Sequence, residues 1–203
     1  MAYNNFTLAK ALGELQLSND DADLFSSVQP VPLPEIFLET LASGRDLALA
    51  INTEKAKAEF IIAPLLLHIK GLLKNQISIF SGVDLNVDGS RGLNGVCDFI
   101  ISRAPRQHVL SAPLIAIVEA KNDNIGDGLG QCIAEMCATQ LYNQQHTSTD
   151  TAPIECVYGI VTIGSAWKFL KLKDNHVTFD LTEYYIDTPQ KIVGIILHII
   201  KNG

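Results

Sequence analysis

The chain reads VCDFIIS over residues 96–102, PLIAIVEAK over 113–121 and GDGLGQCIAEM over 126–136. The first two runs are almost continuously apolar, which is typical of strands covered on both faces, and the third predicts a helix that follows them. Charged residues nevertheless interrupt these runs: Asp98 lies within the first, and Glu119 and Lys121 end the second. Because an unpaired buried carboxylate is costly, we expect these charges to serve a function.

The rest of the chain predicts one α/β domain of the mixed-sheet, α+β kind. Apolar periodicity predicts helices over residues 5–17, 35–43, 53–73, 128–143 and 189–201. It predicts strands over residues 77–87, 96–102, 114–121, 157–163, 167–172 and 176–181, the last two forming a hairpin. Residues 18–34 read as an acidic, proline-rich connector. Gly44 is expected to end the second helix and Pro64 to kink the third.

Composition favours a soluble cytoplasmic protein. The chain has 203 residues, of which 47% are hydrophobic, and this suffices for one compact domain. Its four cysteines lack disulfide or metal-site spacing and fit free thiols in a reducing compartment. The N-terminal residues lack the basic start and apolar core of a signal peptide, and no apolar run approaches the roughly 20 residues of a membrane span.

The net charge limits the partners that we expect. Lys and Arg number 15 and Asp and Glu 22, which gives a net charge of −7. An acidic protein is not built for nonspecific polyanion binding, so contact with nucleic acid needs a local basic surface or metal ions. Candidates for such a basic rim are Arg103, Arg106, His108, Lys168, Lys171, Lys173, Lys55 and Lys57.

The charged residues of the two apolar strands suit metal chemistry. Side chains alternate along a strand, so Glu119 and Lys121 share a face, and Asp98 meets them if the strands are neighbours. Two carboxylates about 4 Å apart repel by roughly 4 kcal/mol at an effective dielectric of 20. Mg²⁺ removes this repulsion, and it prefers one or two carboxylates together with waters and phosphate oxygens. Gln131 and Glu135, four residues apart on the next helix, lie on one helical face.

Asp98 followed by Glu119-Ala120-Lys121 resembles the PD-(D/E)XK nuclease superfamily, whose restriction-endonuclease-like core runs helix, three strands, helix, strand. The predicted order from residue 53 to 172 is the same, with residues 1–50 as an N-terminal helical extension and residues 173–203 as a C-terminal strand and helix. Cys97 replaces the proline that gives the family motif its first letter. The resemblance implies that Asp98, Glu119 and the carbonyl of Ala120 bind metal, and that Lys121 is the catalytic lysine.

Two further residues follow from the same resemblance. Many members carry a glutamate in the first core helix, and Glu59 is the candidate because its helical neighbours Ile62, Ala63 and Leu66 are apolar. Many also carry a glutamine in the helix after the lysine, where Gln131 lies. The implied activity is Mg²⁺-dependent hydrolysis of phosphodiester bonds in nucleic acid, DNA in preference to RNA, with Mn²⁺ as a substitute and a homodimer as a possible assembly.

Simpler interpretations stay open beside these. Asp98 can close a turn, and Glu119 with Lys121 can form an exposed ion pair of about 0–1 kcal/mol. Glu59 can equally pair with Lys55 one turn earlier, and Gln131 can be an ordinary polar residue of the first helical turn. The alternative function is a catalytically inactive nuclease-fold module that binds nucleic acid or protein.

Overall fold

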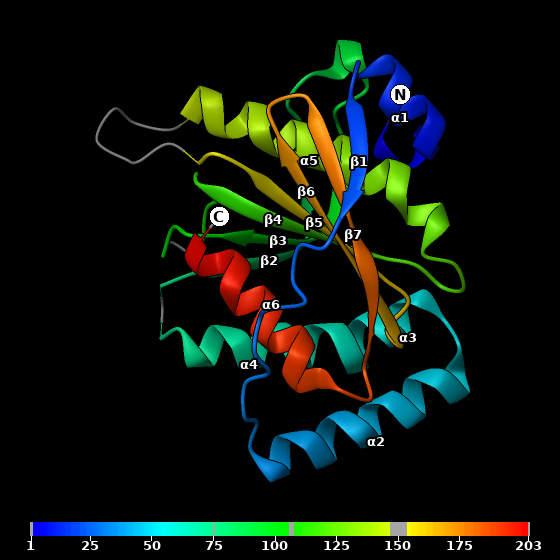
Figure 1. The fold of residues 1–203 in the computed structure, drawn as a ribbon, viewed down its shortest axis with the longest axis vertical. Helices are drawn as coiled ribbons and strands as arrows, with labels where there is room; N and C mark the ends of the chain where they lie inside the picture. The colour runs from blue at the N-terminus through cyan, green and yellow to red at the C-terminus, as the bar shows by residue number, and fades with distance from the viewer. Residues whose placement is uncertain (1, 75, 106–107, 147–153, 203) are drawn as a thin grey trace.

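The computed structural model is built on one mixed sheet of seven strands with helices on both of its faces (Figure 1). It describes residues 2–74, 76–105, 108–146 and 154–202. The strands are β1 (Ser18–Ala22), β2 (Ser78–Asp84), β3 (Val96–Ser102), β4 (Leu114–Ala120), β5 (Val157–Thr162), β6 (Ala166–Lys173) and β7 (His176–Tyr185). Their order across the sheet is β1-β7-β6-β5-β4-β3-β2. This confirms the mixed α/β class.

The strand pairing combines antiparallel neighbours with two parallel pairs. β2, β3 and β4 follow one another antiparallel, and β5 lies parallel to β4. β6 and β7 continue antiparallel as the expected hairpin, and β1 lies parallel to β7 at the edge. The order helix, three strands, helix, strand is therefore present, but the sheet has three strands more than the core that the sequence led us to expect. β1, β6 and β7 are these additional strands; β6 and β7 are the predicted hairpin, and β1 was not predicted.

The helices are α1 (Leu8–Glu14), α2 (Glu35–Ile51), α3 (Glu54–Lys57), α4 (Ala63–Leu72), α5 (Gly126–His146) and α6 (Pro189–Asn202), with a π-helical turn η2 (Ala58–Ile62) and the 3-10 turns η1 (Tyr3–Asn5) and η3 (Gly89–Arg91). One core packs α5, α1 and η1 against the sheet, and the other packs α4 and α6 against its opposite face. Figure 1 shows α5 and α6 on either side of the strands. Within the described part of the chain, no helix has the length and apolar character of a membrane span.

Two expectations about the N-terminal extension are wrong. α2 does not end at Gly44 but continues to Ile51, with Asn52 in the left-handed conformation behind it. Gly44 serves close helix packing instead, because a Cβ there would lie 2.4 Å from the carbonyl oxygen of Phe60. The connector contains strand β1, whose polar sequence SNDDA has low strand propensity and gives no alternating pattern. Backbone pairing with β7 defines this strand rather than burial of its side chains.

The expected long helix over residues 53–73 is present but irregular. It consists of α3, η2 and α4, and the π-helical turn η2 comes directly before Pro64 in the first turn of α4. Proline lacks a backbone N–H and clashes with the preceding turn, and a wide turn accommodates this. The wide turn also changes the phase of the helix, so the pattern of Ile62 and Leu66 does not extend back to Glu59.

The N-terminal segment is held against α5 by a close approach at Gly130. A Cβ at Gly130 would lie 2.3 to 2.5 Å from backbone atoms of Phe6 and Thr7, so no larger residue fits. Tyr3, in the same segment, is buried, and its hydroxyl donates to the carbonyl oxygen of Leu85. The segment therefore closes over the face of the sheet that α5 covers.

We predict that Gly130→Ala lowers the free energy of unfolding by about 1–3 kcal/mol, because the methyl group overpacks this contact. Gly71→Ala is the matched control, since a Cβ at this helical glycine meets nothing within 4 Å. It should raise stability by about 0.5–1 kcal/mol through its effect on the unfolded chain. Urea unfolding of both variants measures the difference, and equal effects would contradict the close packing.

Candidate functional site

The register of β3 and β4 brings Asp98 and Glu119 together. Phe99 pairs with Val118, so the next residues outward, Asp98 and Glu119, lie opposite each other on one face of the sheet. One carboxylate oxygen of Asp98 accepts a hydrogen bond from the backbone N–H of Ala120 at 2.8 Å. Asp98 thus does not close a turn: it lies within β3 and contacts the end of β4.

A chain of polar contacts runs from Glu119 into α5. The Lys121 ammonium donates to Oε1 of Glu119 and, at 3.2 Å, to Oε1 of Gln131. The Gln131 amide nitrogen in turn donates to Oε1 of Glu135 at 3.0 Å. The Glu119 side chain is 1% exposed and that of Lys121 19%, so this is not an exposed ion pair. Gln131 therefore belongs to the same cluster as Glu119 and Lys121.

Burial sets the electrostatics of this cluster. Burial and the charge of Asp98 raise the pKa of Glu119 to about 7, although Lys121 opposes the shift. Burial and the charge of Glu119 raise the pKa of Glu135 well above its usual range. Burial lowers the pKa of Lys121, but the charge of Glu119 and the hydrogen bond to it outweigh burial, so the net shift is upward. The cluster carries more acidic than basic groups and attracts positive charge.

The donor set suits a hard divalent cation. Oε2 of Glu119 is buried without a hydrogen-bond partner among the described residues, an arrangement that costs free energy unless a cation or proton is bound. The same residues contain no group of three or more His, Cys, Asp or Glu side chains gathered as a metal site. Asp98 and Glu119 thus offer two carboxylates, and Mg²⁺ is commonly held by one or two, with waters and phosphate oxygens as the other ligands.

The structure does not bring Glu59 into this cluster. Its side chain is 55% exposed and lies 3.8 Å from the Lys55 ammonium, which is the helix pair that the sequence left open. It lines a surface groove with Leu67 and Phe99, and Phe99 packs into the core on the opposite face of the sheet. The expectation that Glu59 points inward is wrong, because Glu59 lies within the π-helical turn Ala58–Ile62, whose wider period shifts its side chain off the face of Ile62 and Leu66.

Glu54 is the acidic residue of this helix that lies within electrostatic reach of the cluster. Its charge raises the pKa of both Glu119 and Lys121. It occupies the first turn of α3, directly after the Thr53 side chain that caps the helix. An acidic residue at that position is normally explained by the helix dipole, so its place in the sequence does not single it out.

Lys57 was likewise missed as part of the site's framework. This residue is 4% exposed, and its ammonium donates to the backbone and side-chain oxygens of Asn122, directly after Lys121. A Cβ at Gly164, where φ is +81°, would lie 3.2 Å from Cβ of Lys57. The lysine thus joins α3 to the loop after β4 and to the turn after β5. The expectation that Lys57 contributes to a basic surface is wrong, because its side chain is buried.

The other basic residues divide between the two faces of the sheet. Val161 pairs with both Glu119 and Lys168, so Lys168 lies on the cluster's face about 10 Å away by strand spacing. Lys171 lies opposite Tyr158 in the strand register, and Tyr158 packs into the core on the other face of the sheet. The Lys173 ammonium forms an ion pair with the Glu155 carboxylate at 3.1 Å. Arg106 lies outside the described residues. Of the residues that the structure describes, Lys168 thus lies on one face of the sheet and Lys171 on the other, so these two do not share a continuous rim.

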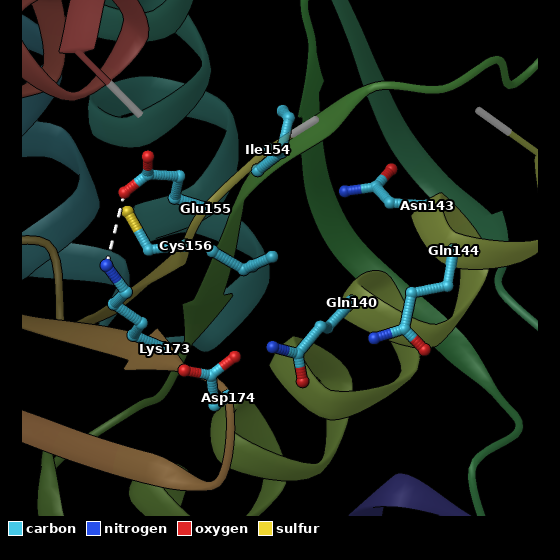
Figure 2. A pocket seen from close by; sticks show the side chains of 9 residues that line it. Gln140, Asn143, Gln144, Ile154, Glu155, Cys156, Lys173 and Asp174 are labelled. Atoms are coloured by element: carbon cyan, nitrogen blue, oxygen red, sulfur yellow. Dashed lines mark hydrogen bonds and ion pairs between the residues drawn. The ribbon is translucent and has the colours of Figure 1, made fainter. Parts of the chain in front are cut away.

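A polar cavity of about 460 Å³ lies at the other end of the sheet (Figure 2). Asn143 of α5 lines it and exchanges two hydrogen bonds with the backbone of Leu114, the first residue of β4. Glu119 is near the last residue of β4, about 17 Å along the strand. The cavity is therefore separate from the cluster, and its polar side chains fasten α5 to β4 and, through the Lys173–Glu155 pair, β6 to the segment before β5.

Comparison with known proteins adds no assignment to this geometry: no family model matches the chain, and no curated protein matches it in sequence.

The pKa of Glu119 predicts a pH dependence of stability. Between the usual value of 4.5 and about 7, the folded protein keeps the proton of Glu119 while the unfolded chain releases it, so stability falls as pH rises through this window. Glu119→Gln should make this fall shallower. Urea unfolding across the window, in a chelator that removes divalent cations, measures the slope.

Glu59→Gln is the control, because this glutamate is exposed and outside the cluster. The free energy of unfolding of this variant should change with pH as steeply as that of the wild-type protein. The same slope in the wild-type protein and Glu119→Gln would show that Glu119 is not a buried acid.

Proposed function

We propose that the protein is a divalent-metal-dependent phosphodiesterase that acts on nucleic acid, with Mg²⁺ as its cofactor. The observation that carries the proposal is Glu119: it is a buried carboxylate with one unpartnered oxygen, opposite Asp98 and bonded to Lys121. A purely structural ion pair gains nothing from a second carboxylate beside it. A metal ion bound between two carboxylates explains why both are present.

The residues of the cluster have separate roles in this proposal. Asp98, Glu119 and the carbonyl oxygen of Ala120 would hold the metal, and Asp98 is itself oriented by the N–H of Ala120. An ion held there would supply a Lewis acid for the phosphate and for a water molecule. Lys121, whose ammonium is partly exposed, donates hydrogen bonds to the attacking water or to the negative charge that develops on the phosphate. Gln131 keeps that ammonium in place through its Oε1.

The order of elements supports an assignment to the PD-(D/E)XK nucleases. The helix α3–α4, the strands β2 to β4, the helix α5 and the parallel strand β5 follow the order of the restriction-endonuclease-like core. Asp98 lies on β3, and Glu119 and Ala120 end β4, with Lys121 directly after it, which agrees with the positions that this assignment requires. Glu54 replaces Glu59 as our candidate for the acidic residue of the first helix, because its charge acts on Glu119 and Lys121.

DNA is the substrate that we favour, with RNA second. The net charge of −7 disfavours nonspecific binding to either polymer. A metal ion reduces this obstacle at the scissile phosphate, since it neutralises part of the local negative charge. Lys168, on the same face of the sheet as Glu119, is the nearest basic residue that the strand register identifies beyond the cluster.

We predict metal-dependent cleavage of nucleic acid by the wild-type protein. Plasmid, linear duplex, single-stranded DNA and RNA are incubated with Mg²⁺ or Mn²⁺, and products are followed on gels. Asp98→Asn and Lys121→Met should each lower the rate by about 100-fold or more, because they remove a metal ligand and a donor to the reacting groups. Glu54→Gln should lower it as well, whereas Glu59→Gln should not.

The control Glu59→Gln changes the same charge on the same helix without touching the cluster. Equal residual activity in the wild-type protein and Lys121→Met would indicate a contaminating nuclease and contradict the proposal. Binding of nucleic acid without cleavage of any substrate would identify the alternative, an inactive module that keeps the fold.

A further inference from the structure

Glu135 is a buried acid for which the proposed mechanism has no use. It lies in the middle of α5 and is 0% exposed, enclosed between the sheet and the N-terminal segment. One of its oxygens accepts from Gln131, and the other has no partner in the described part of the chain. Burying an acid in this way is costly, and a leucine would fill the same volume without the cost. The polar group at this position therefore needs an explanation.

The orientation of Gln131 supplies that explanation. A lysine ammonium has three donors and no acceptor, so the amide must turn its oxygen toward Lys121. Its NH₂ group then points the other way, where it needs an acceptor, and Oε1 of Glu135 is that acceptor at 3.0 Å. Turning the amide over would place its NH₂ group against the ammonium and take its donor away from Glu135. Lys121 and Glu135 together therefore hold Gln131 in the one orientation that serves Lys121.

The surroundings of Glu135 favour its neutral form, which still presents an acceptor oxygen. Burial and the charges of Glu119 and Asp98 raise its pKa, and Lys121 opposes this through space. Cys97 and Cys132 and the hydroxyl of Tyr3 are its other titratable neighbours. A neutral carboxylic acid differs from a glutamine side chain only in an OH in place of NH₂. Glutamine is therefore the closest mimic of this residue.

We propose that Glu135 is a positioning residue that, through Gln131, holds the Lys121 ammonium toward the reacting groups. Its effect on catalysis rests on the proposed phosphodiesterase function, but its effect on Gln131 does not. The acceptor oxygen, and not a negative charge, is what the position supplies. The N-terminal segment protects this arrangement, because Phe6 and Thr7 close over α5 at Gly130, directly before Gln131.

Kinetics of three variants test the proposal. Glu135→Ala should lower kcat by about 10- to 100-fold with little change in KM, the usual cost of losing a residue that orients an active-site group. Glu135→Gln should restore most of the activity. Cys132→Ala is the control: this thiol is buried on the same helix but takes no part in the bonds of Gln131. The Cys132→Ala variant should cleave nucleic acid at the rate of the wild-type protein.

A measurement that needs no catalysis separates this proposal from the proposed function. The side-chain NH₂ signals of Gln131 in an NMR spectrum are identified by their loss in Gln131→Ala. They should keep their shift in Glu135→Gln and change in Glu135→Ala, where the acceptor is gone. An unchanged signal in Glu135→Ala would overturn the proposal, as would full activity in Glu135→Ala or equal impairment in Glu135→Gln. If the wild-type protein cleaves nothing, the phosphodiesterase function fails and the NMR result alone decides the role of Glu135.

Discussion

The buried contact between Glu119 and Lys121 is the interaction on which the site depends. Two opposite charges removed from water stabilise a fold only when their geometry is good and their remaining oxygens and protons are satisfied. Here the lysine is satisfied by Gln131, but the glutamate keeps one free oxygen and faces a second carboxylate, Asp98. The pair is therefore incomplete as a structural element, and either a proton on Glu119 or a bound cation would complete it.

The fold brings this cluster together by closely packed secondary structure. The parallel pairing of β4 and β5 sets the end of β4 beside the first turn of α5, where a Cβ at Gly128 would lie 2.6 Å from the Val161 side chain and 3.0 Å from that of Lys121. Lys57 fastens the loop that follows Lys121 from the other side. The lysine is thus held between rigid elements, as its proposed role toward a reacting phosphate would require.

The central part of this arrangement was predictable from the sequence. Charges within apolar strands are costly enough to stand out, so Asp98, Glu119 and Lys121 were identified from the strands, and the helix that follows identified Gln131. The structure brings these four residues into one cluster. Whether they bind metal and cleave nucleic acid stays a prediction.

The remaining features depend on information that local patterns do not contain. Glu59 was misplaced because a π-helical turn breaks the 3.6-residue period from which its direction was inferred. Gly44 was read as a helix end because its tight contact with Phe60 is a tertiary contact. β1 was missed because an exposed edge strand has no buried face to produce alternation. The position of Glu54 beside the cluster likewise follows from the packing of α3 and not from its own neighbours in the sequence.

The central claim is that Asp98 and Glu119 bind a divalent cation. Crystals of the wild-type protein soaked in Mn²⁺ test this claim most directly. Anomalous scattering locates the metal without reference to activity. The account predicts a Mn²⁺ peak between the carboxylates of Asp98 and Glu119, with the carbonyl oxygen of Ala120 as a further ligand. No peak at this position in crystals that diffract well, with Lys121 still bonded to Glu119, would contradict it.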